Sequence, residues 1–351
     1  GGQHHEQRKR QPVRPPEAQD AQGGASLAAV VAAALHGGGQ LVGAAERTDE
    51  QRHQNGDQRL CPLHQLAAFN IRANGQLANR KVTENIDIKT KTDNPGIDII
   101  IKPGTVGEDV HIPVIISETG LTDLVYNDFY VGENSDVTIV AGCGIHNCGE
   151  KESRHDGIHT FYVGKNAKVK YIEKHYGEGD GNGENVMNPT TIVNIEDGGY
   201  MEMETAQIKG IDSTKRVTRA NLAAGATLVI HEKIMTHGSQ TAETDFSVDL
   251  NGEDSGANVI SRSVAKGNSR QKFVSMINGN NRCSGHTECD AIIMENGKVS
   301  ALPELTANHI DASLIHEAAI GKIAGDQLIK LMTLGLTEQE AEEQIINGFL
   351  K

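Results

Sequence analysis

Cysteine and histidine are concentrated in one short segment near the middle of the chain, AGCGIHNCGEKESRHDGIHTF. The segment contains two cysteines and three histidines: Cys143, His146, Cys148, His155 and His159. Thiolates and imidazoles are ligands that zinc and iron prefer, so the segment predicts a metal site or an iron–sulfur site. Six residues separate Cys148 from His155, which is not a zinc-finger spacing. Buried structural cysteines and hydrogen-bonded strand histidines are the alternative interpretation.

Thiols and an imidazole recur in GNNRCSGHTECDAII, which contains Cys283, His286 and Cys289. An imidazole beside a thiol can lower the pKa of that thiol, which favours attack on sulfur or ligation of a metal. Glu288 and Asp290 place negative charge in the same segment and act in the opposite direction. The segment is therefore compatible with a sulfur nucleophile or with a metal ligand.

A histidine and a carboxylate, His316 and Glu317, stand side by side near the C-terminus. Together they could bind iron or relay protons, and solvated or helix-capping groups are the alternative. Motifs for other chemistry are missing from the sequence, which has neither the phosphate-binding GxxxxGK[ST] pattern nor the GxSxG pattern of hydrolases. The Gly-rich loop at residues 177–185 does not lie between a strand and a helix, so we expect a plain turn there.

The composition excludes several classes of function. The 351 residues include 47 acidic and 33 basic ones, and a formal net charge of −14 disfavours nucleic-acid binding. No run of 18 apolar residues occurs, so no segment is expected to span a bilayer. Five cysteines are too few, and odd in number, for a disulfide framework. We therefore expect free thiols in a reducing compartment and a cytoplasmic location.

The candidate residues must be positioned by β-structure, because segments throughout residues 69–312 alternate between apolar and polar side chains. Turn signals recur at Gly132, Gly164, Gly198, Gly225, Gly252 and Gly279, which are separated by 32, 34, 27, 27 and 27 residues. A short unit that returns at such intervals is typical of a solenoid, and helical periodicity is absent. The sequence therefore predicts a parallel β-helix, with a β-sandwich as the competing fold.

The two ends of the chain differ from this core. Residues 1–68 contain no aromatic residue and too little apolar surface to fold, so we expect a disordered, low-complexity extension. Its apolar run at residues 26–35 predicts a short local helix, and acidic residues in the flank disfavour the alternative of a signal peptide.

Residues 313–351 predict two amphipathic helices. The first covers residues 313–335, and the second runs to about Asn347 behind a capping box formed by Thr337 and Glu340. These helices either cap the open end of the solenoid or form a docking surface for a partner.

From about Asn70 to its end, the chain resembles the SufB/SufD family of iron–sulfur cluster assembly proteins, in particular its short, SufB-like branch. The resemblance is carried by GTVGEDVHIPVIISETGLTDLVYNDFYVGENSDVTIVAGCGIHNCG, SRHDGIHTFYVGKNAKVKYIEKHYGEG, CSGHTECDAIIMENGKVSALPELTA and IHEAAIGKIAGDQLIKLMTLGLTEQEAEEQIINGF. The last segment is the most specific, with the pattern HEA-x3-KI-x2-DQL-x6-G followed by a capped helix that ends in NGF.

The resemblance implies a right-handed parallel β-helix with terminal helices, and a scaffold rather than an enzyme. Such a scaffold accepts sulfur from a cysteine desulfurase and works with a SufC-like ABC ATPase, which supplies ATP hydrolysis. It implies a homodimer or a mixed dimer with a paralogue, and no nucleic acid or membrane as partner. The ATPase would dock on the terminal helices through four apolar residues, Ile323, Leu328, Leu331 and Phe349.

The resemblance also assigns roles to residues. Cys289 matches the essential thiol of SufB proteins, and His316 with Glu317 matches the His-Glu pair before the terminal helices. We hypothesise that Cys289, together with Cys143 or Cys148, holds a nascent cluster, expected to be [4Fe–4S], with His316 or Glu317 as a further ligand. A bound flavin is compatible with the resemblance but is not predicted by any residue.

Two functions from other classes compete with this hypothesis. In the first, the chain is a β-solenoid binding protein in which Cys143, Cys148, His155 and His159 hold a structural zinc ion, with His146 as a further donor. In the second, it is a solenoid hydrolase or lyase that acts on a polymer. A hydrolase or lyase requires a groove of paired carboxylates, and the sequence offers no obvious pair.

Overall fold

The computed structural model of the chain describes residues 67–351. The predicted disordered extension and the predicted helix at residues 26–35 lie outside the described residues, apart from the last two residues of the extension. Those two, Ala67 and Ala68, are buried residues of the first strand.

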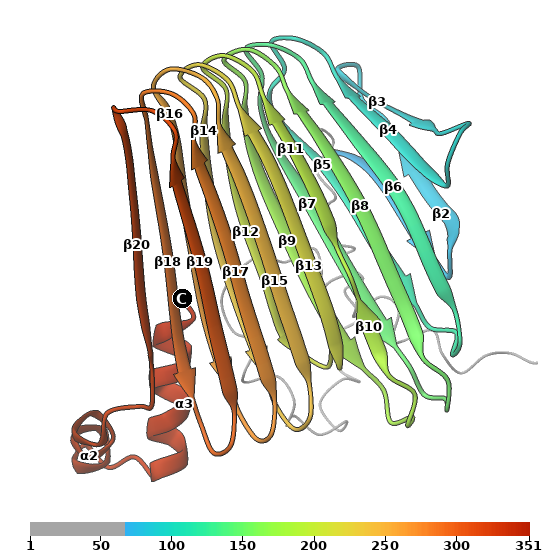
Figure 1. Cartoon of the computed structure of the whole chain (residues 1–351). Coiled ribbons are helices and arrows are strands. Elements are labelled where there is room, and N and C mark those ends of the chain that lie inside the picture. Colours follow the sequence, from blue (N-terminus) through green and yellow to red (C-terminus); the bar gives the residue numbers. More distant parts are fainter. Residues whose placement is uncertain (1–66) are drawn as a thin grey trace, which may run out of the picture.

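The described chain winds into a solenoid of two ten-stranded sheets (Figure 1). From Val106 onward, successive strands alternate between the two sheets, except that β10 (Asn185–Met187) and β11 (Thr190–Ile195) follow each other in the second sheet. Each strand pairs in parallel with strands of the neighbouring coils. This pairing confirms the predicted parallel β-helix and excludes the competing sandwich, whose sheets are antiparallel.

In spatial order, the first sheet contains β2 (Gln76–Lys81), β1 (Ala67–Ala73), β5 (Val106–Ile116), β7 (Asp136–His146), β9 (Lys168–Glu178), β12 (Tyr200–Lys209), β14 (Thr227–Thr236), β16 (Ser255–Ala265), β18 (Cys283–Ile293) and β20 (Ala312–Gly321). The second contains β19 (Lys298–Ala307), β17 (Arg270–Gly279), β15 (Thr241–Leu250), β13 (Ser213–Leu222), β10 (Asn185–Met187), β8 (Ser153–Val163), β6 (Thr122–Val131), β4 (Gly96–Ile101) and β3 (Ile86–Thr90), and β11 (Thr190–Ile195) lies beside β10 between β13 and β8.

The two ends of the solenoid are built differently. At the N-terminal end, β2 pairs antiparallel with β1, and β3 pairs antiparallel with β4. At the C-terminal end, β20 and β19 are the outermost strands of their sheets within the described residues. Unpaired edges of this kind are templates for pairing with another chain. We call this end the open end.

The predicted turns are present where the coils change sheet. Asn134, Asn166 and Asp254 have φ values of 58°, 55° and 59°, a left-handed conformation that Asn and Asp tolerate better than most residues. Aromatic rings also stack between neighbouring coils. The rings of Phe129 and Phe161 lie 4.4 Å apart and nearly parallel inside the solenoid, and those of Tyr130 and Tyr162 stack on its outer face. Turn signals and stacked side chains therefore fix the coil register together.

The interior of the solenoid has a large apolar part and a polar band. Inward side chains of both sheets form the main apolar cluster, such as Val137 and Ile139 of β7 in the first sheet and Phe129 and Phe161 in the second. A smaller apolar cluster around Ile145 and Met187 lies at the other end of the coils. Between the two clusters, strands of both sheets point polar and charged side chains inward. This polar band contains most of the candidate chemistry.

The C-terminal segment corrects one prediction. Residues 312–321 form strand β20, not the first part of a helix, and the first helix is the shorter α2 (Gly325–Thr333). Pairing with β18 overrides the helix propensity of an alanine- and glutamate-containing segment. The second helix, α3 (Glu338–Phe349), begins with the predicted capping box of Thr337 and Glu340.

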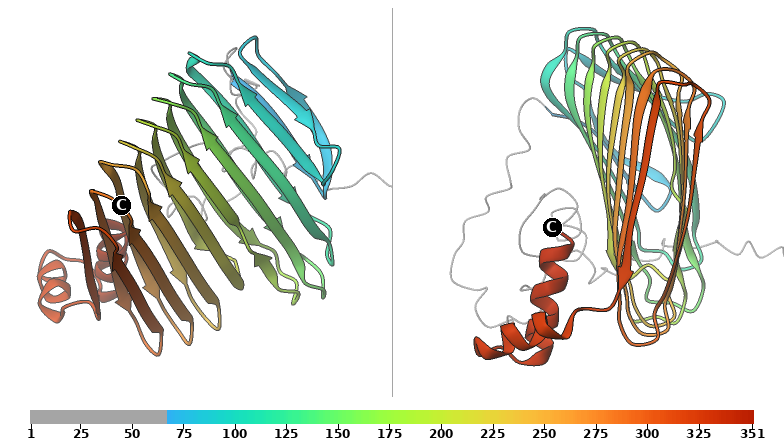
Figure 2. Two further views of the ribbon diagram at one scale, coloured as in Figure 1. Left: turned by 45° about the horizontal axis from the view of Figure 1, so that its top comes forward. Right: turned by 60° about the vertical axis from the view of Figure 1, so that its left-hand side comes forward.

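Helix α3 packs on the outer face of the first sheet near the open end (Figure 2). Its Ile346 contacts an apolar patch that includes Val264 and Met294. Within residues 67–351, no helix is long and apolar enough to cross a membrane.

Candidate functional site

One inward position of the first sheet carries a polar side chain in five successive coils. The β-sheet register stacks Glu173, Thr205, Glu232, Ser261 and Cys289 one above another. Each of the five is at most 3% exposed. This ladder crosses β9, β12, β14, β16 and β18, and it ends one strand before the open end.

Two buried carboxylates in the ladder share one buried cation. Arg216 of β13 forms an ion pair with Glu173, and its Nε lies 3.4 Å from Glu232 Oε1. Although burial alone would raise the pKa of Glu173, the charge of Arg216, with a smaller contribution from His175, holds it well below its usual range. Burial dominates at Glu232 and raises its pKa, although Thr244 and Ser261 donate hydrogen bonds to it at 3.0 and 2.7 Å. The polar band therefore holds a fixed charge distribution away from water.

Cys143 lies at the far end of the polar band, on β7, and is 4% exposed. Its thiol forms hydrogen bonds with the imidazoles of His155 and His175. Burial opposes ionisation of the thiol, but the neighbouring imidazoles outweigh it and lower its pKa to about 7. Burial likewise disfavours a charged His155, and Cys143 and Asp123 outweigh that effect and raise the pKa of His155 to about 10. Near neutral pH this pair favours a thiolate beside an imidazolium.

The imidazoles around Cys143 are oriented by their own partners. His155 Nδ1 donates to Asp123 Oδ2 at 3.0 Å, and Arg72 in turn donates to the other Asp123 oxygen at 2.8 Å. Arg216 contacts His175 Nδ1 at 3.3 Å. Such second contacts fix the ring orientation, as they do around ligating or catalytic histidines.

His159 is a neutral structural histidine, not a free ligand. The amide of Asn127 donates to its Nε2 at 3.3 Å, so its Nδ1 carries the proton and donates to the hydroxyl of Tyr171 at 2.7 Å. That hydroxyl in turn donates a hydrogen bond to Glu173 Oε1, 2.9 Å away. Burial is the main reason that the pKa of His159 falls to about 4. Both ring nitrogens are occupied, which removes His159 from the predicted metal set.

Several polar atoms of the band have no hydrogen-bond partner among residues 67–351. They are the Thr205 hydroxyl, Gln207 Oε1 and Asn127 Oδ1, and Thr205 and Gln207 are only 3% and 2% exposed. A buried polar atom without a partner costs about 1–3 kcal/mol, so such atoms usually face water or a guest. The band therefore offers sites for small polar species inside the solenoid.

Cys289 lies on β18 with its side chain inside the solenoid, 1% exposed. Burial, with smaller contributions from Glu232 and Asp290, raises its pKa to about 12. On a strand, neighbouring side chains alternate between faces, so His286 points outward while Cys283 and Cys289 point inward. The prediction of a thiol activated by His286 is therefore wrong.

The predicted ligand pair, His316 and Glu317, is divided between the two faces of β20. His316 pairs in register with inward Thr287, two residues before Cys289, so His316 and Cys289 are diagonal neighbours inside the open end. Its Nδ1 is buried and has no hydrogen-bond partner within the described part of the chain. Glu317 is exposed on the outer face.

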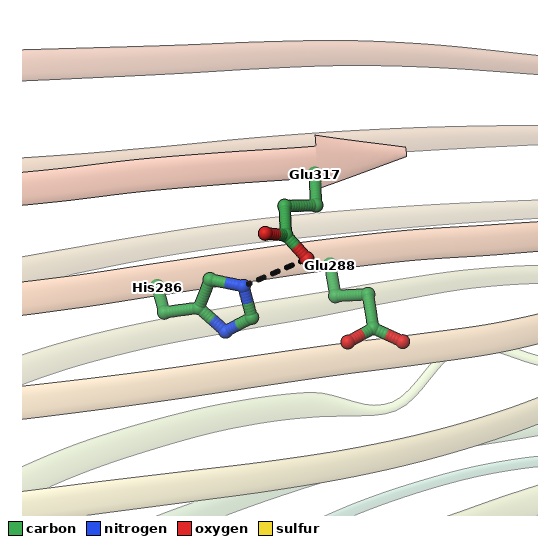
Figure 3. A group of neighbouring side chains, drawn as sticks. All are labelled: His286, Glu288 and Glu317. Atoms are coloured by element: carbon green, nitrogen blue, oxygen red, sulfur yellow. Dashed lines mark ion pairs between the residues drawn. The ribbon is translucent and has the colours of Figure 1, made fainter. Parts of the chain in front are cut away.

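On that outer face, Glu317 forms a group with His286 and Glu288 (Figure 3). One donor atom from each of the three residues lies within 4.8 Å of the others. His286 Nδ1 donates to Asn258 Oδ1 at 2.8 Å, and its other ring nitrogen, Nε2, faces Glu317 Oε2 at 3.8 Å. One imidazole and two carboxylates suit a borderline divalent cation such as Fe²⁺, Mn²⁺ or Zn²⁺. Within residues 67–351 this is the one group of three or more such donors that could hold a metal ion.

Cys148 lies outside the solenoid, just beyond the end of β7, and is exposed. Its Sγ is 3.1 Å from His146 Nε2. Cys143 is buried on the inner side of the same strand, in contact with His155. The four residues of the predicted zinc set therefore do not converge on one point.

Cys143 and Cys289 lie far apart within one chain. Four strands, β9, β12, β14 and β16, separate β7 from β18 in the first sheet. Five strand spacings of about 4.8 Å place the two thiols roughly 24 Å apart. A single cluster cannot reach both, so the expectation that Cys289 and Cys143 or Cys148 of one chain share a cluster is not supported by the geometry.

The four predicted partner-binding residues have different surroundings. Ile323 and Phe349 pack against the patch that attaches α3 to the sheet. Leu328 and Leu331 of α2 are half-buried. The apolar side chains that α2 and its C-terminal end leave exposed are instead Ile329 (60%), Met332 (43%) and Leu334 (76%).

The acidic partners of the histidines, and the ladder from Glu173 to Cys289, were not predicted from the sequence. Asp123 is 32 residues before His155, and Glu178 is 32 residues after His146. This separation is the coil period, and residues one period apart stack on each other. The turn spacing in the sequence therefore contained the signal that pairs these residues.

A family model described as SUF system FeS cluster assembly, SufBD core domain, matches residues 122–349, which is more than half of the chain. An iron–sulfur cluster assembly SufBD family protein of Archaeoglobus fulgidus is 31% identical over 228 residues, covering 65% of this chain and 60% of that protein. One from Methanocaldococcus jannaschii is 29% identical over 255 residues, covering 72% of this chain and 79% of that protein. The chain thus matches less than two thirds of the Archaeoglobus protein's length.

Proposed function

Because the chain belongs to the SufBD family of iron–sulfur cluster assembly proteins, we propose that it is a scaffold that combines iron and sulfide at the open end of its solenoid. One observation carries the proposal. The buried thiol of Cys289 and the outward group of His286, Glu288 and Glu317 lie on the same two strands, β18 and β20. A sulfur ligand and a site suited to Fe²⁺ are thus separated by the thickness of one sheet.

The polar band supports an internal route for sulfur between Cys143 and Cys289. Cys143 ionises near neutral pH, which suits it to carry sulfane sulfur, and the ladder from Glu173 to Cys289 connects its neighbourhood with the open end. Unpartnered donors and acceptors such as Thr205 and Gln207 can hydrogen-bond a small sulfur species in transit. The apolar clusters on both sides of the band exclude bulk water from this route.

A cluster at the open end needs more ligands than one chain provides there. Cys289 and His316 supply one thiol and one imidazole to the interior, and β20 and β19 have no further strand beside them among the described residues. We propose that the open ends of two chains meet, as a homodimer or with a paralogue, so that the facing residues complete the ligand set of a transient [4Fe–4S] cluster. A dimer by edge pairing also covers the two exposed sheet edges.

Other components of the machinery would dock elsewhere. The sequence has no phosphate-binding loop, so a SufC-like ABC ATPase would supply ATP hydrolysis. The exposed apolar side chains of Ile329, Met332 and Leu334 make α2 and its C-terminal end the best docking surface for that ATPase. The four described cysteines are free thiols, which fits a reducing compartment such as the cytoplasm and a persulfide from a cysteine desulfurase as the sulfur source.

Anaerobic purification of the full chain together with its ATPase tests the scaffold role. We expect iron and acid-labile sulfide in equal amounts in the complex, and the ATPase should co-purify. Stoichiometric zinc without sulfide would instead establish the zinc-binding alternative and overturn the proposal.

A further inference from the structure

Outside the polar band, a thiol, an imidazole, a carboxylate and a phenol hydroxyl lie in contact on the surface of the solenoid. Cys148 Sγ lies 3.1 Å from His146 Nε2, and His146 Nδ1 lies 3.2 Å from Glu178 Oε1. The hydroxyl of Tyr176 donates to the other oxygen of Glu178. His146 and Glu178 are register partners on the outward face of β7 and β9. The sheet itself therefore holds the imidazole and the carboxylate together.

The hydrogen bonds determine where the protons are. Glu178 accepts from His146, so Nδ1 carries the ring proton and Nε2 presents a lone pair to the thiol of Cys148. A nucleophile within reach of a base, with the base oriented by a third group, is the arrangement of activated cysteine nucleophiles. Tyr176 holds the third group in place.

The same geometry excludes a shared metal ion at this group. The thiol contacts one ring nitrogen and the carboxylate contacts the other, and these nitrogens point in different directions from the ring. One ion cannot bind the sulfur and the carboxylate through the same imidazole in this arrangement. The group is therefore built to move a proton, not to chelate.

The loop that carries Cys148 is held by a neighbouring glycine-rich loop. A Cβ at Gly179 would lie 2.0 Å from the carbonyl oxygen of Asn147, and one at Gly181 would lie 2.3 Å from that of Gly149. Only glycine permits this approach of two backbones, which explains the GEGDGNGEN segment. The side chain of Asn147 also donates to the carbonyl oxygens of Lys151 and Gly183 at 2.8 and 3.1 Å. Cys148 is thus exposed to solvent on a loop whose backbone is held by these contacts.

We propose that Cys148 is the surface thiol on which this protein accepts sulfane sulfur from a persulfide donor, with His146 as general base and Glu178 as positioning residue. The inference rests on the proposed function, which requires a sulfur supply. His146 takes the thiol proton, and the Cys148 thiolate attacks the terminal sulfur of the donor persulfide. The S–S bond of the donor breaks, its electron pair leaves with the donor thiolate, and His146 returns the proton to that thiolate. A donor persulfide and a thiol become a donor thiol and a Cys148 persulfide, without an oxidant or reductant.

The test exposes the full chain anaerobically to glutathione persulfide and locates the added sulfur by alkylation and mass spectrometry. We expect one extra sulfur atom on Cys148 in the wild-type protein and none at this position in Cys148→Ser. A persulfide that forms first on Cys143 or Cys289, or a mixed glutathione disulfide on Cys148, would overturn the proposal.

The role of the base is tested by the rate of transfer. An ordinary thiol is only a few per cent thiolate at pH 7, so loss of the base in His146→Gln should slow transfer by about tenfold to thirtyfold. At pH 10, hydroxide replaces the base and the two rates should converge. His231→Gln, a matched change of a half-exposed outward histidine on β14, should transfer at the wild-type rate. Equal rates of His146→Gln and wild type at pH 7 would refute the role of His146.

The same variants separate this inference from the scaffold proposal. With inorganic sulfide as the sulfur source, Cys148→Ser should still build a cluster, because sulfide needs no acceptor thiol. If wild-type protein accepts sulfur on Cys148 but builds no cluster from iron and sulfide, the scaffold role fails and the acceptor role stands. With persulfide as the source, a two-electron reductant is added to both proteins to convert sulfane sulfur into sulfide. If Cys148→Ser then builds its cluster from persulfide as fast as the wild type does, the acceptor role fails alone.

Discussion

Arg216 is the position where the charge arrangement of the interior can be tested most sharply. It is 2% exposed and lies between the buried carboxylates of Glu173 and Glu232. Replacement by Gln in Arg216→Gln keeps much of the side-chain length but removes the cation. Breaking a buried ion pair from one side typically costs about 3–5 kcal/mol, because the remaining charge has no partner. We expect a loss of this size in the free energy of unfolding at pH 7.

Arg219→Gln is the matched control, three residues later on the same strand. Arg219 pairs with Asp245 at 2.9 Å, but the side chains are 43% and 28% exposed. Pairs exposed to solvent typically contribute about 0.2–1 kcal/mol, so this variant should lose at most about 1 kcal/mol. Urea unfolding of the two variants and the wild-type protein, followed by circular dichroism, measures both losses.

The pH dependence gives the Arg216 test a second readout. The pKa of Glu173 is lowered in the folded protein, so its ionised form contributes stability above the unfolded pKa of about 4.5, and this stability is lost as the pH falls. The difference between wild type and Arg216→Gln should therefore be largest near pH 7 and shrink below about pH 4.5. A loss no larger than that of Arg219→Gln, or a loss independent of pH, would refute the assignment of a buried charged triad.

Three further outcomes are expected. His159 has a pKa of about 4 in the folded protein and 6.5 in the unfolded chain, so the unfolded chain binds more protons between these values. Stability should therefore fall as the pH drops from 6.5 to 4. Urea unfolding across this range should show that part of this fall disappears in His159→Gln but not in His231→Gln. Asn258→Ala removes the residue that orients His286 and should weaken Mn²⁺ binding by about 10–100-fold, measured by electron paramagnetic resonance. Glu317→Gln removes a ligand and should weaken binding at least as much. Unchanged affinity in Glu317→Gln would argue against the cation site. Ile329→Asp should abolish co-purification of the ATPase while leaving thermal stability unchanged, because this side chain is 60% exposed; retained binding would place the docking surface elsewhere.

The solenoid was predictable because its signal is local and repeated. Each coil needs a turn, and the spacing of turn residues such as Gly225 and Gly252 reports the coil length directly. The same period predicts which residues stack, and it would have paired His155 with Asp123. Strand alternation similarly separates inward Cys289 from outward His286. These parts of the site follow from period and parity alone.

Strand β20 was not predictable from its own residues. Its segment contains good helix formers, and apolar residues at Leu314, Ile315 and Ala318 fit a helical stripe as well as a strand. What decides its conformation is the open edge of β18, which offers a complete row of backbone hydrogen bonds. Likewise, no local signal reveals that Arg216 neutralises Glu173, because the two lie in different sheets. The conformation of β20 and the Arg216–Glu173 ion pair both depend on contacts between residues far apart in the sequence.

The central claim is that Cys289 anchors cluster assembly at the open end. The most direct test is anaerobic reconstitution of Cys289→Ser with ferrous iron and inorganic sulfide, with iron and sulfide analysis and visible absorption as readouts. Cys283→Ser is the matched control, since it removes another buried thiol from the same strand. We predict that Cys289→Ser holds no cluster while Cys283→Ser keeps the wild-type content. Wild-type iron, sulfide and absorption in Cys289→Ser would contradict the account.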